Sequence, residues 1–156
     1  MFQVKIKNIS TENFKDFGKV VSFPEKQPTS EAVHYQFWSD IASYSIEGQT
    51  EIGLCKVLKQ KRNIINSMER HLNTPEILIP IDAPFVLPVM RKSDSGKSAE
   101  AFKVDIGQAV IINSAIWHGA CIPVNQNESS YFVIFRRGTP AEDVQLSDTQ
   151  EIEIVD

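Results

Sequence analysis

Residues 69–84 read ERHLNTPEILIPIDAP, and this stretch decides the fold that we expect. Its polar start ends in the breakers Asn73–Pro75, an apolar run follows, and a second turn at Asp82–Pro84 closes it. Short apolar runs between turn residues are typical of strands, whose side chains alternate between two faces. We therefore predict a strand–turn–strand unit in which Glu69 and His71 share one face and Glu76 opens the returning strand beside them.

Most of the remaining chain follows the same pattern of short apolar runs separated by Pro, Gly, Asn and Asp. The other runs are Val20–Phe23, His34–Trp38, Ile52–Leu58, Phe85–Met90, Ala101–Val104, Ala109–Ile112, Ile116–Ile122 and Tyr131–Phe135. Many short strands with turn signals between them indicate a β-sandwich or β-barrel.

Three further segments complete the prediction. Residues Thr11–Phe17 form the best helix candidate, with Ser10 or Thr11 as the N-cap and Gly18 as the stop. The polar stretch Arg91–Glu100 predicts an exposed loop. In the acidic C-terminal tail, Ile152–Val155 is expected to form a last edge strand.

Length and charge narrow the classes of function. A chain of 156 residues suits a single domain, residues 1–156. A net charge of -4 without a basic stripe argues against a nucleic-acid partner. No apolar run approaches the roughly 20 residues that cross a bilayer, and the N-terminus lacks the basic-then-apolar order of a signal peptide. We therefore expect a cytoplasmic protein that acts on a small molecule.

A second segment supplies a further histidine. Gly107 marks a turn, an apolar strand follows, and Asn113–Ser114 precedes His118. This arrangement predicts a hairpin that delivers His118 to the pocket of His71 and Glu76. Imidazole and carboxylate ligands suit nickel, zinc, manganese or ferrous iron, with a coordination position left open for substrate. Each residue alone is more often a core or surface side chain, and it is the joint pattern that favours a metal site.

These two segments resemble the two cupin motifs. The first cupin motif carries a His-x-His pair, then a Glu and a Gly; here Glu69 replaces the first His, and Asp82-Ala83 stands where the Gly falls. The second motif is kept through Gly107 and His118, with Asn113 or Ser114 in place of its Pro. The resemblance implies an all-β, cupin-type double-stranded β-helix barrel with one short N-terminal helix.

The chain also resembles the ureidoglycolate lyase family, which is cupin-like, over nearly its whole length. The features in the family's order are Phe14–Val21, Met68–His71, Ile79-Pro80, Gly107–Val110, Ile116–His118 and Arg137-Gly138. Two positions depart from the family: Gly119 stands where a second His often follows, and Glu76 stands where Gln is frequent.

This resemblance implies a metal-dependent lyase that cleaves ureidoglycolate, or a related ureido or hydroxy acid, to glyoxylate and urea, in purine catabolism (allantoin degradation). It implies a divalent metal on His71, Glu76 and His118, with nickel as first choice and manganese or zinc as alternatives. Glu69 is then either a fourth ligand or the general base. The family also implies a homodimer.

A substrate carboxylate favours an arginine fork nearby. Arg137 is the expected partner, because it shares strand parity with Tyr131 and Phe135 and matches the family's Arg-Gly. Tyr35 and Phe37, like Trp38 and Trp117, are expected in core or dimer packing rather than in substrate stacking.

Two other functions stay open at this point. Cupins also serve as non-catalytic binding modules for a small carboxylate or sugar, and the departures at Glu69, Glu76 and Gly119 are compatible with lost catalysis. A metal-dependent oxygenase or isomerase would use the same three ligands.

Overall fold

The computed structural model describes residues 1–91 and 98–156, and strands dominate it. The predicted loop Arg91–Glu100 lies in large part outside the described residues. The strands are β1 (Phe2–Asn8), β2 (Gly18–Val21), β3 (Ser30–Ala32), β4 (Tyr35–Phe37), β5 (Thr50–Leu58), β6 (Ile64–Arg70), β7 (Glu76–Pro80), β8 (Phe85–Met90), β9 (Glu100–Val104), β10 (Ala109–Ile112), β11 (Trp117–His118), β12 (Ile122–Pro123), β13 (Glu128–Arg136) and β14 (Gln145–Val155). The helices are α1 (Thr11–Phe14) and α2 (Thr139–Glu142).

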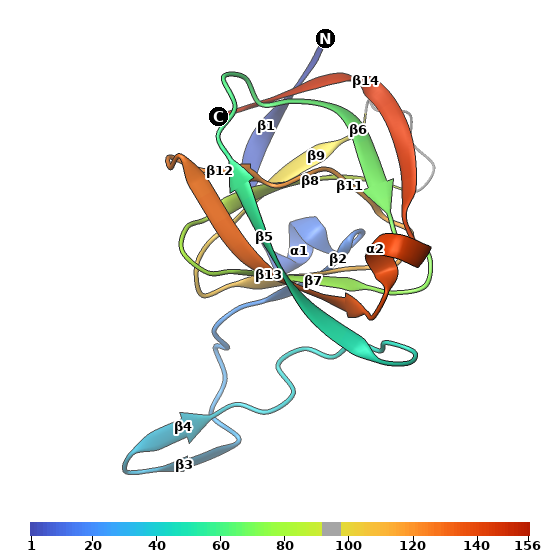
Figure 1. Cartoon of the computed structure of the whole chain (residues 1–156). Helices are drawn as coiled ribbons and strands as arrows, with labels where there is room; N and C mark the ends of the chain where they lie inside the picture. Colours follow the sequence, from blue (N-terminus) through green and yellow to red (C-terminus); the bar gives the residue numbers. More distant parts are fainter. Residues whose placement is uncertain (92–97) are drawn as a thin grey trace.

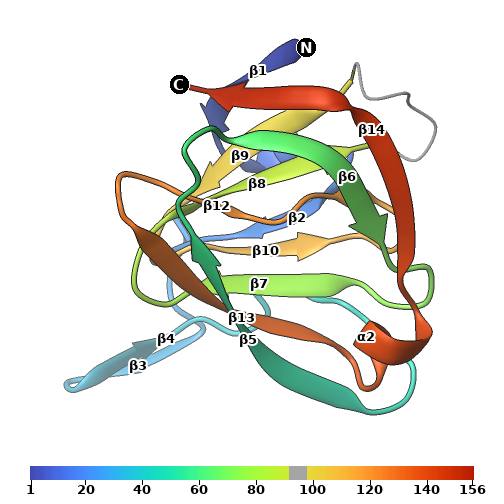
Figure 2. The same ribbon diagram turned by 45° about the horizontal axis from the view of Figure 1, so that its top comes forward.

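Two sheets pack face to face and form a barrel (Figures 1 and 2). The larger sheet has the order β11-β6-β14-β1-β9-β8-β12, and β11 also pairs with β8, so this sheet closes on itself. The smaller sheet has the order β2-β10-β7-β13-β5, and β5 is its edge among the described strands. The predicted all-β, cupin-type barrel is confirmed.

The last strand differs from the prediction. Ile152–Val155 belongs to β14, which lies inside the larger sheet and not at its edge. One side of β14 pairs antiparallel with β6 and the other pairs parallel with β1, so Ile152 and Ile154 are buried. The pairing of β1 with β14 joins the two ends of the chain. The alternation of apolar and polar residues identifies a strand but does not show which distant strand it pairs with.

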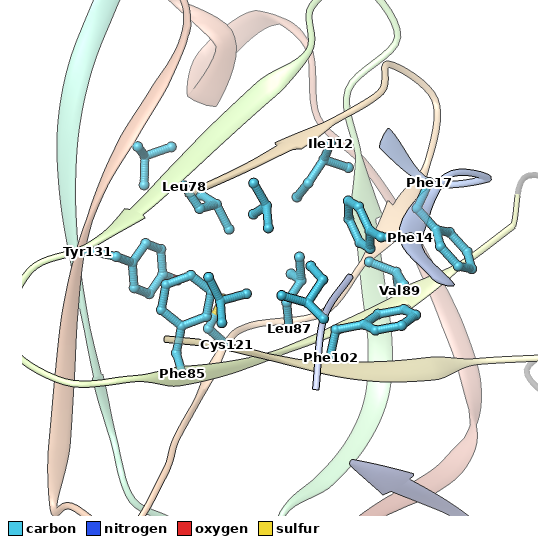
Figure 3. Close-up of a cluster of buried hydrophobic side chains, with 14 of the residues drawn as sticks. Phe14, Phe17, Leu78, Phe85, Leu87, Val89, Phe102, Ile112, Cys121 and Tyr131 are labelled. Carbon is cyan, nitrogen blue, oxygen red and sulfur yellow. The ribbon is translucent and has the colours of Figure 1, made fainter. Parts of the chain in front are cut away.

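The main hydrophobic core lies between the two sheets (Figure 3). Leu78 of β7 and Tyr131 of β13 come from the smaller sheet, and Leu87 of β8 and Phe102 of β9 come from the larger one. Phe14 packs edge-on against Phe102 with ring centroids 5.3 Å apart. Because this core fills the space between the sheets, it fixes the strands that carry the candidate site.

The N-terminal helix is present but shorter than predicted. The Ser10 hydroxyl accepts a hydrogen bond from the Asn13 amide, and the Asn13 side chain accepts one from the Ser10 amide, which forms a capping box. Gly18 then enters β2, where a Cβ would lie 1.8 Å from the Ile111 main-chain oxygen. The close approach of β2 to β10 therefore requires glycine. A second short helix, α2, was not predicted.

Residues 22–49, here called the arm, leave the barrel after β2, and their hairpin β3–β4 projects away from it (Figure 1), while Ser43 returns to the barrel through a hydrogen bond from Lys19. Its strands β3 and β4 pair with each other and, among the described strands, with no other. Tyr35 and Phe37 are exposed, so of the two predicted alternatives, core packing or dimer packing, the first does not hold for them. No helix among the described residues has both the length and the apolar character needed to span a membrane.

Candidate metal centre

Strands from both sheets bring the predicted residues together. Glu69 lies in β6, His71 follows the end of that strand, and Glu76 begins β7. β11 pairs antiparallel with β6, and His118 stands opposite Glu69 in the register. The predicted turn does join β6 to β7, but the two strands belong to different sheets and do not pair with each other. β10 and β11 likewise lie in different sheets, so the hairpin predicted to deliver His118 is not formed.

Glu76 lies between the two histidines. Its Oε2 atom is 3.0 Å from His118 Nε2 and 3.3 Å from His71 Nε2. The two imidazole rings lie 5.2 Å apart, centroid to centroid. All three side chains are buried. Glu69 is half-buried. One carboxylate oxygen of Glu69 and one ring nitrogen each of His71 and His118 all lie within 4.8 Å of one another.

The orientation of His71 is set by the residue that follows α2. His71 Nδ1 lies 2.7 Å from the main-chain oxygen of Asp143. A carbonyl oxygen only accepts, so Nδ1 carries a proton and Nε2 is the nitrogen that faces Glu76. The Asp143 carboxylate accepts hydrogen bonds from the amides of Leu72 and Asn73, each 2.9 Å long. Asp143 therefore fixes the loop that holds His71.

Thr74 ties the same loop to β13. The side chain of Thr74 is buried, and its hydroxyl oxygen accepts a hydrogen bond of 3.0 Å from the amide of Arg136. On the other side, the amide of Ala115 donates to the main-chain oxygen of His71 at 2.6 Å. These contacts hold the turn between β6 and β7 at a fixed distance from β11 and β13.

The charges at the centre are coupled. Burial alone would raise the pKa of Glu76, but the two histidines beside it, His118 first, lower that pKa to about 2. Burial likewise lowers the pKa of His71, and the contact with the negative charge of Glu76 outweighs it, so the pKa of His71 is raised. A carboxylate that stays ionised beside two imidazoles is a suitable anionic ligand for a cation.

The residues present fit a divalent metal. Three buried atoms have no hydrogen-bond partner among the described residues, namely His71 Nε2, His118 Nε2 and Glu76 Oε2. Buried polar atoms without partners are rare and require an explanation. Two imidazole nitrogens and one carboxylate oxygen that converge in this way are the donor set of nickel, zinc, manganese and iron sites.

A cavity of about 530 Å³ gives access to the centre. This volume is in the range of small-molecule sites. The lining residues are Glu51, Gly53, Leu54, Cys55, Glu69, His71, Glu76, Tyr131, Val133, Phe135, Pro140, Val144 and Leu146. A second cavity of about 330 Å³ is lined by His118 and Gly119, among others, and Glu69 and Leu146 line both. Glu69 therefore faces solvent-accessible space on two sides.

The structure does not bring Arg137 to this cavity. β13 ends at Arg136, so the alternation used in the prediction does not extend to Arg137. Its side chain is exposed, and Nη1 donates to Gln49 Oε1 at 3.1 Å. Gly138 then adopts a left-handed φ of 87° and turns the chain into α2. The placement of Arg137 gives no support to its predicted contact with a substrate carboxylate.

Sequence reasoning missed Asp143 and the wall formed by β5. Asp143 lies 72 residues after His71, in an acidic tail with no motif that marks it. The strand parity of Tyr131 and Phe135 did indicate that they face inward, and both line the cavity. Nothing in the sequence indicated that Glu51 and Cys55 would stand opposite them.

Comparisons with known proteins bear on this centre. The family model described as ureidoglycolate lyase matches residues 1–155. Among curated proteins, a sequence search finds no match.

Comparison with solved structures finds likenesses of low identity. An oxalate decarboxylase from Bacillus subtilis is 18% identical, with a TM-score of 0.43, over 56% of this chain and 21% of that one. An oxalate decarboxylase from Lactobacillus farciminis is 11% identical, with a TM-score of 0.46, over 62% and 26%. A dTDP sugar isomerase from Desulfovibrio desulfuricans is 15% identical, with a TM-score of 0.49, over 84% and 82%. The chain spans about a fifth of the length of the Bacillus subtilis decarboxylase.

Proposed function

This chain belongs to the ureidoglycolate lyase family, and we propose on that basis that it is a metal-dependent lyase that cleaves ureidoglycolate, or a closely related ureido or hydroxy acid, to glyoxylate and urea. One observation carries the proposal beyond the family match. Two buried histidines and a buried glutamate converge, and their His71 Nε2, His118 Nε2 and Glu76 Oε2 atoms have no hydrogen-bond partner among the described residues. His71 and Glu76 line the cavity of about 530 Å³, and His118 lines the adjoining one of about 330 Å³.

Each of the three buried side chains has a part in holding the cation. His71 and His118 would offer their Nε2 lone pairs, and Glu76 would offer Oε2 as the anionic ligand. When bound, a divalent cation lowers the pKa of a hydroxyl that it contacts, as it does for water. Nickel is our first choice for this ion, with manganese or zinc as alternatives.

Glu69 is the best candidate for the proton transfer. Glu76 is a poor base, because its pKa is about 2 and both histidine Nε2 atoms lie close to its Oε2 atom, at 3.0 and 3.3 Å. Glu69 stands opposite His118 and faces both cavities, so a substrate in either can reach its carboxylate. General acid–base help of this kind contributes about 10²–10⁴ in rate.

The reaction balances with one such residue. Glu69 takes the proton from the carbinol hydroxyl, and the oxygen lone pair forms the carbonyl bond of glyoxylate. The carbon–nitrogen bond breaks, and its electron pair leaves on the urea nitrogen. Glu69 then returns its proton to that nitrogen, so no co-reactant is consumed and the enzyme ends in its starting protonation state.

The charge of the cavity constrains how the substrate lies. The acidic residues Glu51, Glu69 and Glu76 line it, and none of the described lining residues is Lys or Arg. An anionic substrate would be repelled here without a cation. The substrate carboxylate is therefore expected toward the imidazole end of the cavity, where the cation would be held.

The direct test is to measure glyoxylate and urea release from ureidoglycolate. The purified protein would be stripped with a chelator, reloaded with nickel or manganese, and compared with the stripped sample. We expect equimolar products from the reloaded protein and none from the stripped one. Glu76→Gln should abolish release, and Glu12→Gln, an exposed glutamate in α1, is the matched control that should keep it.

Release from the stripped sample, or full activity of Glu76→Gln, would contradict the proposed site. Absence of release from the reloaded protein, with metal content verified, would contradict the proposed substrate. A saturable metal site with no turnover of any ureido or hydroxy acid would favour a binding module instead.

A further inference from the structure

The chain after His118 leaves a gap in the larger sheet. β6 has β14 on one side and β11 on the other, and its register with β11 contains a single pair, His118 opposite Glu69. Beyond that pair the Gly119 amide donates to the main-chain oxygen of Pro88 at 3.0 Å, and β12 continues along β8. The chain therefore follows β8, and the rest of β6 has no paired strand on this side among the described residues.

A cavity of about 330 Å³ lies in this gap, and we call it the side cavity. Its lining comes mainly from β6 and from residues 118–120. Glu69 and Leu146 line both the side cavity and the cavity of about 530 Å³, which we call the main cavity. The two cavities therefore adjoin at Glu69, and one oxygen of its carboxylate lies within 4.8 Å of a ring nitrogen of His118.

The side cavity suits an uncharged, mainly apolar group. Glu69 and His118 are its only ionisable residues among those described. Asn66 and Ser67 add polar side chains, and both are exposed. A carboxylate would be repelled by Glu69 here, with no lysine or arginine of the lining to balance it. The lining residues without a polar side chain are Ile64, Ile65, Met68, Gly119, Ala120 and Leu146.

Gly119 keeps the side cavity open. It is buried, and its φ does not lie in the left-handed region, so the backbone conformation alone does not require glycine. An added Cβ would lie 3.3 Å from Ile65 Cδ1 and 3.5 Å from Pro88 Cγ. A larger side chain would therefore take up space beside Ile65, which also lines the side cavity. The departure from the family at Gly119 thus has a physical consequence, because it leaves this space free.

The apolar lining continues beyond the side cavity. A third cavity of about 230 Å³ shares Ile64, Ile65 and Ala120 with it. The third cavity adds Val57 of β5 and Ile122 of β12. A flexible carbon chain that passes Glu69 would therefore stay against apolar side chains, and it would gain affinity from the apolar surface that leaves water.

The proposed reaction directs the ureido end of the substrate toward the side cavity. The substrate carboxylate is expected beside the imidazoles, where the cation would be held. Glu69 has to reach the nitrogen that it protonates, so this nitrogen lies where the two cavities adjoin. The second urea nitrogen then lies farther from the centre. Because the volume of the main cavity is already in the range of small-molecule sites, ureidoglycolate itself does not need the side cavity.

We infer that the side cavity is a second subsite of this centre, and that it receives a neutral, mainly apolar substituent on the far urea nitrogen of the substrate. The preferred substrate is then an N-substituted ureido acid. Its cleavage gives glyoxylate and an N-substituted urea by the proton transfers described above, so no co-reactant is consumed. The assignment to a ureido acid rests on the proposed function, whereas the apolar subsite beside Glu69 does not.

Analogues that cannot be cleaved measure the subsite without turnover. Ureidoacetate lacks the carbinol hydroxyl, and its N′-butyl derivative adds a carbon chain at the far nitrogen. Isothermal titration of the nickel-reloaded protein with each compound gives the ratio of the two dissociation constants. Each fully buried methylene contributes about fourfold in affinity, so the butyl compound should bind at least about tenfold tighter. The N′-carboxypropyl derivative should bind no tighter than ureidoacetate, because its carboxylate would meet Glu69.

Two substitutions narrow the side cavity. Gly119→Val fills the space beside Ile65, and Ala120→Phe does so from an exposed position that disturbs the core less. Each should bring the ratio of the two dissociation constants close to unity. The ratio is taken within each variant, so a general loss of affinity or of metal does not imitate this result. Ala32→Phe, at an exposed alanine in β3, is the matched control and should keep the native ratio.

The outcomes separate the subsite from the proposed function. A native ratio near unity, tighter binding of the carboxypropyl compound than of the butyl compound, or a native ratio kept by both Gly119→Val and Ala120→Phe would overturn the subsite. If Gly119→Val does not fold, Ala120→Phe decides alone. Glyoxylate release from ureidoglycolate without a gain from the butyl chain would overturn the inference and leave the proposed function. A gain that the variants lose, in a protein that releases no glyoxylate, would contradict the proposed function and leave the subsite.

Discussion

His71 Nδ1 lies 2.7 Å from the main-chain oxygen of Asp143, and this contact joins the turn after β6 to the residue that follows α2. It fixes both the tautomer and the direction of the imidazole, because the ring nitrogen that donates to a carbonyl cannot be the one that accepts. The Asp143 carboxylate strengthens the link through the amides of Leu72 and Asn73. Asp143, which was not among the predicted ligands, therefore sets the orientation of the predicted ligand His71.

Replacement of Asp143 should loosen His71 and weaken metal binding. Asp143→Ala removes two amide acceptors, so we expect metal affinity to fall about 10–100-fold, as it does when residues that orient metal-binding histidines are changed. Asp143→Asn keeps one acceptor and should show a smaller loss. Isothermal titration of the stripped protein with nickel measures both values. Asp148→Ala, at an exposed aspartate in β14, is the control, and an equal loss there would show a nonspecific effect.

His118→Ala should remove the metal and keep the fold. The imidazole comes from a two-residue strand whose neighbours β6 and β8 are held by other contacts, so its loss leaves both cores in place. We expect metal content below a tenth of native by elemental analysis, with an unchanged circular dichroism spectrum. Retention of full metal content by His118→Ala would mean that the cation, if present, is held elsewhere.

Glu69→Gln separates a base from a ligand. If Glu69 moves the proton, the glutamine variant should keep its metal content and lose about 10²–10⁴ in kcat. KM should change little, because the amide is nearly isosteric with the carboxylate. Loss of metal together with activity would instead assign Glu69 to the coordination sphere. Glu12→Gln again serves as the matched control.

Much of this centre could be predicted from local patterns. Alternation in β6 placed Glu69 and His71 on the same side of the chain, and the Asn73–Pro75 turn predicted that Glu76 would return beside them. His118 does reach this centre, but the hairpin predicted after Gly107 is not formed, because β10 pairs with β2 and β7 in the smaller sheet whereas β11 pairs with β6 and β8 in the larger one. The alternation of side chains in a strand and the position of a turn are both local features, so the sequence alone can reveal them.

Other parts depend on contacts that no local pattern encodes. Arg137 was predicted to face the cavity because the strand was assumed to continue, but β13 ends one residue earlier. The aromatic residues of the arm have the composition of a core strand, yet β3 and β4 leave the barrel. Asp143 reaches His71 only after β13 and α2 have folded back.

Acid should destabilise the turn between β7 and β8 through Asp82. Its carboxylate accepts a hydrogen bond of 2.8 Å from the Ser130 amide, and this bond lowers the pKa of Asp82 below its usual 3.8. A lowered folded-state pKa means that the stabilisation is present above about pH 4 and is lost as the pH falls through the folded-state value. Asp82→Asn should therefore flatten the dependence of the urea midpoint on pH between about 2 and 5. An unchanged slope would show that Asp82 is not linked to folding.

Removal of the metal should lower the melting temperature, and the size of the shift can be stated in advance. A ligand that binds only the folded chain at 100 times its dissociation constant stabilises it by about 2.7 kcal/mol. For a chain of this length, each kcal/mol moves the melting temperature by about 2–4 °C. We therefore expect a drop of about 5–10 °C when a chelator strips nickel from the native protein. In His118→Ala and Glu76→Gln the same treatment should leave the melting temperature unchanged, because the cation is already absent. A chelator effect of equal size in both variants would place the stabilising cation away from His71, Glu76 and His118.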